Sequence, residues 1–190
     1  MTDEIRTFIA ANIPEETREK IYGVRRLLRN ELKSVRWVSS ENLHLTLKFL
    51  GNIYSDSSDK IAEVLDETLD DFTGLNMNLS GLGVFPDERR PRVIWAGLDG
   101  ELSRLSVMAE KINKSLSSYE LGSKKNHFTP HITIGRFNKH KTEKNILNII
   151  EKYSSMINGY FLIDEVVLYE SRLTEKGAIY TPIFTKRLKK

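Results

Sequence analysis

The sequence predicts an α+β protein of two similar lobes, each an antiparallel sheet with helices on its outer side. Strand-like and helix-like segments alternate along the 190 residues, the order of elements in the second half resembles that in the first, and one short strand motif occurs twice. No serine- or glycine-rich linker separates the two halves. We therefore expect residues 1–190 to form a single domain made of two interleaved lobes.

The first half of the chain predicts a strand, a helix, a strand and a helix. Residues 5–12 alternate as a strand does, and residues 15–33 place apolar side chains on one helical face and basic side chains on the other. Residues 44–49 alternate again and should end at the turn residues 50–52. Serine and aspartate can then cap a helix over residues 57–71.

The second half predicts a hairpin, a helix, the repeated motif strand, another helix and two long closing strands. We expect these elements at residues 75–85 with 93–96, 101–117, 131–134, 143–153, 160–170 and 179–188. Glycines at positions 81 and 83 fall inside the first hairpin strand, which indicates a bulge or close packing at that point.

The repeated motif is His44-Leu45-Thr46-Leu47, which returns as His131-Ile132-Thr133-Ile134. Side chains two apart on a strand share a face, so each copy offers one imidazole and one hydroxyl on the same side. The apolar members should point into the core: Leu45, Leu47, Phe49, Ile132 and Ile134. Two such strands facing one another would form a cleft suited to acid–base chemistry at a phosphate. The alternative is two amphipathic strands whose solvent faces carry His and Thr by coincidence.

Two imidazoles and two hydroxyls match what in-line hydrolysis of a phosphodiester needs. Histidine titrates near pH 6.5, so one ring can be a neutral base while its partner is a charged acid. Thr46 and Thr133 can donate hydrogen bonds to non-bridging phosphate oxygens. A metal site would normally add carboxylates or thiolates, but neither motif contains Asp or Glu and the chain has no Cys. A metal-dependent phosphoesterase is therefore the less favoured alternative, and neither a metal nor a cofactor is expected.

The composition is that of an ordinary soluble protein, with 39% hydrophobic and 29% charged residues. The 29 Lys and Arg against 26 Asp and Glu leave a net charge of +3, which permits a nucleic-acid partner without demonstrating one. The basic face of the helix at 15–33 is either a solvated surface or an RNA track. An acidic start without a signal-peptide layout, and the lack of an apolar run of about 20 residues, predict a cytoplasmic protein with no membrane association.

The two His-x-Thr-x motifs and their surroundings resemble the 2H phosphoesterases, and among them the LigT branch of 2′-5′ RNA ligases and RNA 2′,3′-cyclic phosphodiesterases. The similarity extends over nearly the whole chain. It is carried by residues 6–10, 37–38, 41–51, 85–86, 91–97, 130–136 and 168–171. The resemblance implies a bilobal LigT-like fold in which the two motifs face each other across a central active-site groove.

The resemblance also implies a metal-independent enzyme that opens the 2′,3′-cyclic phosphate ends of RNA to 2′-phosphates. It makes His44 the general acid that protonates the leaving 3′ oxygen, and His131 the general base that activates water. Strict alternation predicts that Arg136 lies on the core face. The resemblance implies instead that its side chain points toward the phosphate. Phe8 and Phe128, which flank the motif strands in sequence, are candidates for stacking a terminal base. The reverse reaction at the same site would join a 2′,3′-cyclic phosphate end to a 5′-hydroxyl end in a 2′-5′ linkage, without ATP.

Two alternatives to this function stay open: a 2H enzyme that acts on small cyclic nucleotide phosphates, and a module that binds RNA or nucleotides without turnover. Turnover of mononucleotides against oligonucleotides distinguishes the first, and the presence of both His argues against the second. The expected partner is RNA with 2′,3′-cyclic phosphate ends, tRNA fragments among them, and the protein is expected to be a monomer.

Overall fold

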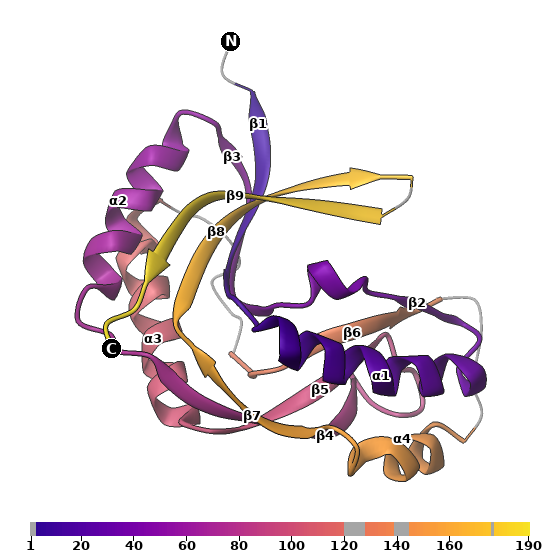
Figure 1. The fold of residues 1–190 in the computed structure, drawn as a ribbon. Helices are drawn as coiled ribbons and strands as arrows, with labels where there is room; N and C mark the ends of the chain where they lie inside the picture. The colour runs from indigo at the N-terminus through magenta and orange to yellow at the C-terminus, as the bar shows by residue number, and fades with distance from the viewer. Residues whose placement is uncertain (1–2, 120–127, 139–144, 176) are drawn as a thin grey trace.

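A computed structural model describes residues 3–119, 128–138, 145–175 and 177–190, and within them it has nine strands and four α-helices (Figure 1). The strands are β1 (Glu4–Ala11), β2 (Val35–Trp37), β3 (Leu45–Tyr54), β4 (Leu75–Phe85), β5 (Val93–Gly100), β6 (Ile132–Phe137), β7 (Asn158–Ile163), β8 (Glu165–Thr174) and β9 (Gly177–Arg187). The helices are α1 (Glu15–Glu31), α2 (Ser57–Leu69), α3 (Leu102–Ser115) and α4 (Ile146–Ser154), with short 3-10 turns η1 (Ser40–Asn42) and η2 (Ser117–Tyr119). The predicted α+β class is confirmed.

The strands form one antiparallel sheet that is almost divided in two. Its order is β7-β4-β5-β6-β3-β1-β8-β9, and the short edge strand β2 pairs with β6. At the centre, β3 and β6 share a single register pair, Leu45 opposite Ile132, whereas neighbouring pairs of strands form longer ladders. This narrow junction separates a first lobe (β3, β1, β8, β9) from a second lobe (β6, β5, β4, β7, with β2). The junction also places the starts of the two motif strands side by side.

The helices cover the outer sides of the two lobes. Helices α2 and α3 pack on each other and against β3, whereas α1 and α4 lie together on the second lobe (Figure 1). Each helix buries an apolar stripe, as the sequence periodicity predicts; in α1 the stripe includes Ile21, Val24 and Leu28. The opposite, inner face of each half-sheet carries the motif His and Thr side chains, so the site lies away from the helices.

The predicted strand over residues 160–170 is wrong, because the chain leaves one lobe and enters the other within it. β7 ends at Ile163 on the edge of the second lobe, and β8 begins at Glu165 beside β1 in the first lobe. Between them, the carbonyl of Asp164 accepts a hydrogen bond from the backbone N–H of Leu188 at 2.8 Å. No glycine or proline lies between the two strands, so the sequence carries no turn signal at the crossing. The first lobe is therefore built from both ends of the chain.

Both motif strands carry a β-bulge directly after the motif threonine. In the first lobe, Thr46 and Lys48 face consecutive residues of β1, which leaves Leu47 as the extra residue. In the second, Thr133 and Gly135 face consecutive residues of β5, which leaves Ile134 as the extra residue. A bulge resets the alternation of the strand. In β6, and in β3 as far as a second irregularity at Leu50, the residues beyond the bulge therefore lie on the face opposite to the one that strict alternation predicts.

Candidate active site

His44, the residue directly before β3, is held by a backbone carbonyl and by two aromatic rings. Its Nδ1 lies 2.8 Å from the carbonyl oxygen of Asn42, and its ring centroid is 4.8 Å from that of Phe8 and 5.3 Å from that of Tyr180. The side-chain amide of Asn42 donates to the carbonyl of Ala178 at 2.7 Å, which ties η1 to β9. With Nδ1 bound to a carbonyl, Nε2 is the nitrogen left to exchange a proton with a ligand.

His131, directly before β6, is held in the same way. Its Nδ1 lies 2.7 Å from the carbonyl oxygen of Thr129, and its ring meets Phe85 edge-on at 5.0 Å, with Trp95 at 6.4 Å. A Cβ on Gly83 would lie 2.2 Å from the Trp95 ring, so the glycine is what lets the indole cross strand β4 at this place. The predicted close packing at this glycine therefore supports one of the two imidazoles.

The two motif threonines lie on the inner face of the sheet, half-buried, while Leu45 and Ile132 beside them are fully buried on the other face. Thr46 faces Ala10 of β1, and Thr133 faces Trp95 of β5. Because Leu45 and Ile132 pair directly across the junction, the two hydroxyls and the two imidazoles converge at the centre of the sheet. This convergence agrees with the cleft that the repeated motif predicts.

The residue five positions after each histidine also lies on the inner face, as a result of the two bulges. Arg136 is exposed there, and strand β6 continues past it to Phe137, so the arginine reaches this face through the bulge rather than through an early strand end. Phe49 occupies the matching position in β3 and is 50% exposed, with its ring 6.2 Å from that of Phe8. The prediction that Phe49 points into the core is therefore wrong. Strand β3 likewise continues through Gly51 to Tyr54 instead of ending in a turn.

Burial and positive charge depress the pKa of both imidazoles. Burial lowers the pKa of His44 to about 4, against the opposing effect of its bond to the Asn42 carbonyl, and the charges of Arg136 and His131 add to the lowering. Burial also lowers the pKa of His131, again opposed by its carbonyl bond, and Arg136 lowers it further. Both rings are therefore mainly neutral near pH 7, and Arg136 lies close enough to both to affect each one.

Five of the seven predicted site residues lie on the inner face of the sheet around the junction of β3 and β6: His44, His131, Thr46, Thr133 and Arg136. Phe8 lies beneath His44 and is 3% exposed, so its ring supports the imidazole and has no open face for a base. Phe128 is half-buried against the core. Phe49 was missed as a site residue. Comparison of the two motif strands would have found it, since it stands five residues after its histidine, as Arg136 does.

The described part of the chain contains neither a cluster of metal ligands nor a helix that could span a membrane. No three His, Asp or Glu side chains come together there in a way that could hold a metal ion. Across the same residues, no helix has both the length and the apolar character needed to span a membrane.

This fold and site define a phosphoesterase of the two-histidine class, in which paired His-x-Thr-x strands meet at one point of the sheet. The chain belongs to the family described as LigT like Phosphoesterase, whose model matches residues 12–95 and 98–180. It is 34% identical over 180 residues to the RNA 2′,3′-cyclic phosphodiesterase of Methanocaldococcus jannaschii, covering 94% of this chain and 98% of that protein. It is also 34% identical over 180 residues to the Archaeoglobus fulgidus protein of the same name, covering 93% and 96%.

A solved structure shows the same fold. Escherichia coli LigT, crystallised with 3′-AMP, superposes with a TM-score of 0.78 at 24% identity, and the match covers 99% of this chain and all of that one. The predicted family and bilobal LigT-like fold are thus confirmed.

Proposed function

We propose that the protein is an RNA 2′,3′-cyclic phosphodiesterase that hydrolyses the cyclic end to a 2′-phosphomonoester. The observation that carries this proposal is the pair of imidazoles, each fixed through Nδ1 to a carbonyl two residues earlier in the chain, on two strands that meet at one point. The archaeal relatives that share a third of its sequence carry this activity as their name.

In the proposed reaction, water attacks phosphorus and the bond from phosphorus to the 3′ oxygen breaks. One imidazole takes a proton from the water, and the other gives a proton to the departing 3′ oxygen, so the ring opens to a 2′-phosphate and a 3′-hydroxyl. We assign the acid to His44 and the base to His131, as the family resemblance implies. The carbonyl bonds fix both rings, so Nε2 is the atom that moves the proton in each.

The charge that develops on the phosphorus oxygens needs donors that are already in place. The hydroxyls of Thr46 and Thr133 share the inner face with the imidazoles, and the Arg136 guanidinium adds a positive charge. The exposed ring of Phe49, beside the support of His44, suits the base of the terminal nucleotide. The phosphate is then held mainly by the second lobe, and the base by the first.

Because the pKa of both imidazoles is lowered, the mechanism must gain a proton before it can act. An acid–base pair needs one protonated ring, yet both rings are neutral near pH 7 before substrate enters. A phosphate anion placed between the rings raises the pKa of both. We infer that the enzyme takes up one proton together with the substrate, and that kcat/KM, which reports the free enzyme, has a more acidic optimum than kcat.

The test is an oligonucleotide ending in a 2′,3′-cyclic phosphate, incubated with the protein after exhaustive EDTA treatment. We expect a gain of one water and a single product, which phosphorus NMR identifies as the 2′-phosphate. Activity that vanished with EDTA and returned with divalent ions would refute the mechanism of two histidines. A 3′-phosphate product would mean that the bond from phosphorus to the 2′ oxygen breaks instead of the bond to the 3′ oxygen. Reverse ligation, monomeric state, cytoplasmic location and tRNA fragments as substrates stay predictions.

A further inference from the structure

The edge strand β2 places a second arginine beside the one in the active site. Arg36 is directly opposite Arg136 in the antiparallel pairing of β2 with β6, and both are exposed. Opposed residues in such a pair share a face with their Cβ atoms about 5 Å apart, and like charges there repel. Neither guanidinium is ion-paired with a carboxylate anywhere in the part of the chain that the structure describes. A bound anion would remove this repulsion.

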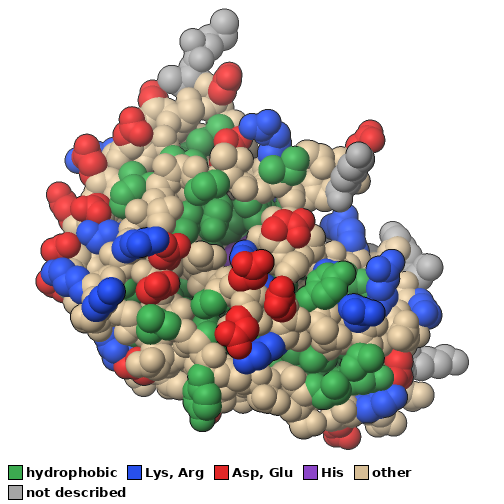
Figure 2. All heavy atoms as spheres, viewed as in Figure 1, with side chains coloured by type: hydrophobic (Ala, Val, Ile, Leu, Met, Phe, Trp, Pro, Cys, Tyr) green, Lys and Arg blue, Asp and Glu red, His purple; other side chains and the backbone are tan. Residues whose placement is uncertain are grey.

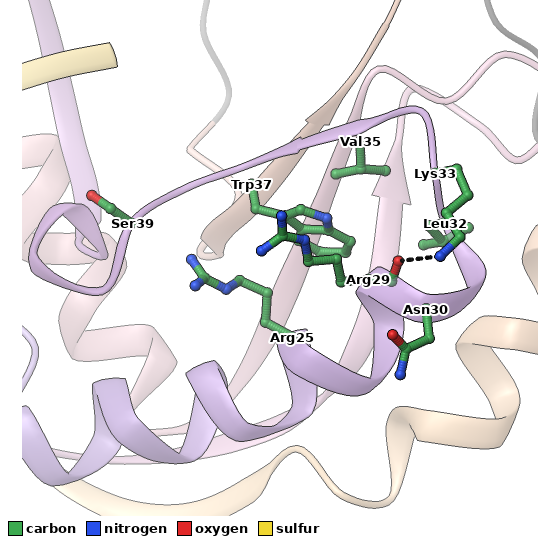
Figure 3. Close-up of a pocket in the computed structure, with 8 residues that line it drawn as sticks. All are labelled: Arg25, Arg29, Asn30, Leu32, Lys33, Val35, Trp37 and Ser39. Carbon is green, nitrogen blue, oxygen red and sulfur yellow. Dashed lines mark hydrogen bonds between the residues drawn. The ribbon is translucent and has the colours of Figure 1, made fainter. Parts of the chain in front are cut away.

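The other face of β2 borders a basic hollow. Between α1 and β2 lies a depression of about 660 Å³, a volume that can receive a nucleotide. Figure 3 shows Arg25 and Arg29 reaching from α1 toward β2, where Trp37 lies, with Lys33 at the end of the helix. Among the residues that the structure describes, no acidic one lines this hollow. Cations beside an aromatic ring are the combination that binds single-stranded nucleic acid.

Two cations of this hollow lack the ion pairs that other lysines on and beside α1 form. Lys20 pairs with Glu16 at 3.3 Å, and Lys152 of α4 pairs with Glu31 at 2.6 Å. Arg29 and Lys33 form no such pair among the described residues. In Figure 2, blue Lys and Arg side chains, with green apolar patches between them, gather over the end of α1 that leads to β2. The charges of Arg29 and Lys33 are thus not neutralised by a carboxylate among the described residues.

Arg25 is already fixed in position within the hollow. Its guanidinium donates a hydrogen bond to the carbonyl of Val38 and lies 4.1 Å from the centre of the Tyr22 ring. The backbone N–H of Val38 in turn donates to the carbonyl of Ile134, the bulged residue of the second motif strand, at 3.0 Å. The hollow is therefore joined by short contacts to the strand that carries Thr133 and Arg136, with the edge strand β2 between them.

We propose that Arg25, Arg29, Lys33, Arg36 and Trp37, here called the β2 basic surface, bind the nucleotides that precede the cyclic phosphate in an RNA strand. Phosphates lie against Arg36 and then against Arg29 and Lys33, and one base stacks on Trp37. This inference rests on the proposed function and makes its substrate specific: a single-stranded RNA end is preferred over a free cyclic mononucleotide. Because the contacts are to phosphates and a ring face, the binding tolerates any base sequence.

The test compares kcat/KM for a short single-stranded RNA with a 2′,3′-cyclic end and for a 2′,3′-cyclic mononucleotide. The variants are Arg36→Gln and the double variant Arg29→Gln with Lys33→Gln. On the RNA we expect about a tenfold loss for each variant, the size of a hydrogen bond to a charged group. The slope of log kcat/KM against log salt should become shallower by about 0.7 for each phosphate contact removed. Turnover of the mononucleotide should change little.

Arg26→Gln is the matched control. It removes the same charge from the same helix, but Arg26 does not line the hollow beside β2; it lines the neighbouring one, with Leu27 and Met156. It should behave as wild type on both substrates. Equal losses on RNA and mononucleotide, or losses as large for Arg26→Gln as for Arg36→Gln, would overturn the β2 basic surface as an RNA site, and so would a wild type with equal kcat/KM and equal salt dependence on both substrates. A wild type that hydrolyses neither substrate would instead refute the proposed function.

Discussion

The two motif strands are near copies in geometry. In each, the histidine precedes the strand, its Nδ1 is bound to a carbonyl two residues earlier, aromatic rings pack against the imidazole, and a bulge follows the threonine. These features recur at corresponding positions of the two lobes, and the rings and partner strands that complete each copy come from its own lobe. Each lobe therefore positions its own imidazole without help from the other lobe. The narrow junction then brings the two positioned imidazoles together.

The two copies differ in what surrounds them. The residue after the bulge is an exposed ring in the first lobe, Phe49, and an exposed cation in the second, Arg136. His44 is also the more enclosed ring, with Phe8 and Tyr180 around it and a pKa near 4. A symmetric frame therefore presents an asymmetric surface. A nucleotide, with a base at one end and a phosphate at the other, has the same asymmetry.

The largest expected effect comes from the imidazoles. His44→Ala and His131→Ala should each lower kcat by about 10²–10⁴, the usual contribution of a positioned acid or base. A substrate with an activated leaving group in place of the 3′ oxygen needs no acid, so it should restore much of the rate to His44→Ala and little to His131→Ala. If the activated substrate restored the rate of His131→Ala instead, His131 would be the general acid and His44 the general base.

The threonines come next, and they test whether both lobes contribute to charge stabilisation. Thr46→Ala and Thr133→Ala should each lower the single-turnover rate by about 10²–10³, because a donor to the developing charge is lost. Thr→Ser, which keeps the hydroxyl, is the control at each position. An unchanged rate for one of the two alanine variants would show that the phosphate lies within the other lobe alone.

Arg136→Gln should lower kcat/KM by about 10–10², the size of a hydrogen bond to a charged group, and should also move the pH profile. Because the Arg136 charge lowers the pKa of both imidazoles, its removal raises both, and the bell of kcat/KM against pH shifts upward. Arg136→Lys, which keeps the charge, should leave the profile near that of wild type. A loss of rate with no shift in the bell would place the guanidinium away from the rings.

The enclosure of His44 predicts an acid-sensitive stability. The unfolded chain has a histidine pKa near 6.5 and so binds more protons than the folded chain between that pH and about pH 4. The free energy of unfolding should therefore fall as the pH drops through this range, by at most about 3 kcal/mol from His44. Urea unfolding of His44→Gln should show a weaker pH dependence than that of His131→Gln. Equal dependence in the two variants would contradict the difference in enclosure.

The smallest expected effect is that of Phe49→Ala. Loss of one stacked base costs about 1–3 kcal/mol, so KM should rise by about tenfold or more while the pH profile stays in place. Phe49→Tyr, which keeps a ring, serves as the control. An unchanged KM for a cyclic-phosphate substrate would mean that the exposed ring has no contact with the base.

The sequence by itself determined the α+β class, the approximate extents of the helices, and the two imidazoles and two hydroxyls of the repeated motif. These follow from periodicity and spacing, which are properties of short stretches of chain. The helix predicted over 15–33 is observed as Glu15–Glu31, and the hairpin strand predicted over 75–85 is observed as Leu75–Phe85. His44 with Thr46, and His131 with Thr133, share a face because neighbours two apart on any strand do so.

The tertiary structure alone decided what lies beyond each bulge and which segments meet. A bulge depends on the register with a partner strand distant in sequence, so alternation misplaced Phe49 and could not place Arg136. The crossing at Asp164 and the pairing of Arg36 with Arg136 depend on distant partners in the same way. The burial of Phe8 under His44 likewise requires β1 to lie between β3 and β8. Local periodicity fixes which side chains a strand can offer, but only pairing between distant strands fixes the face and the neighbours that each one has.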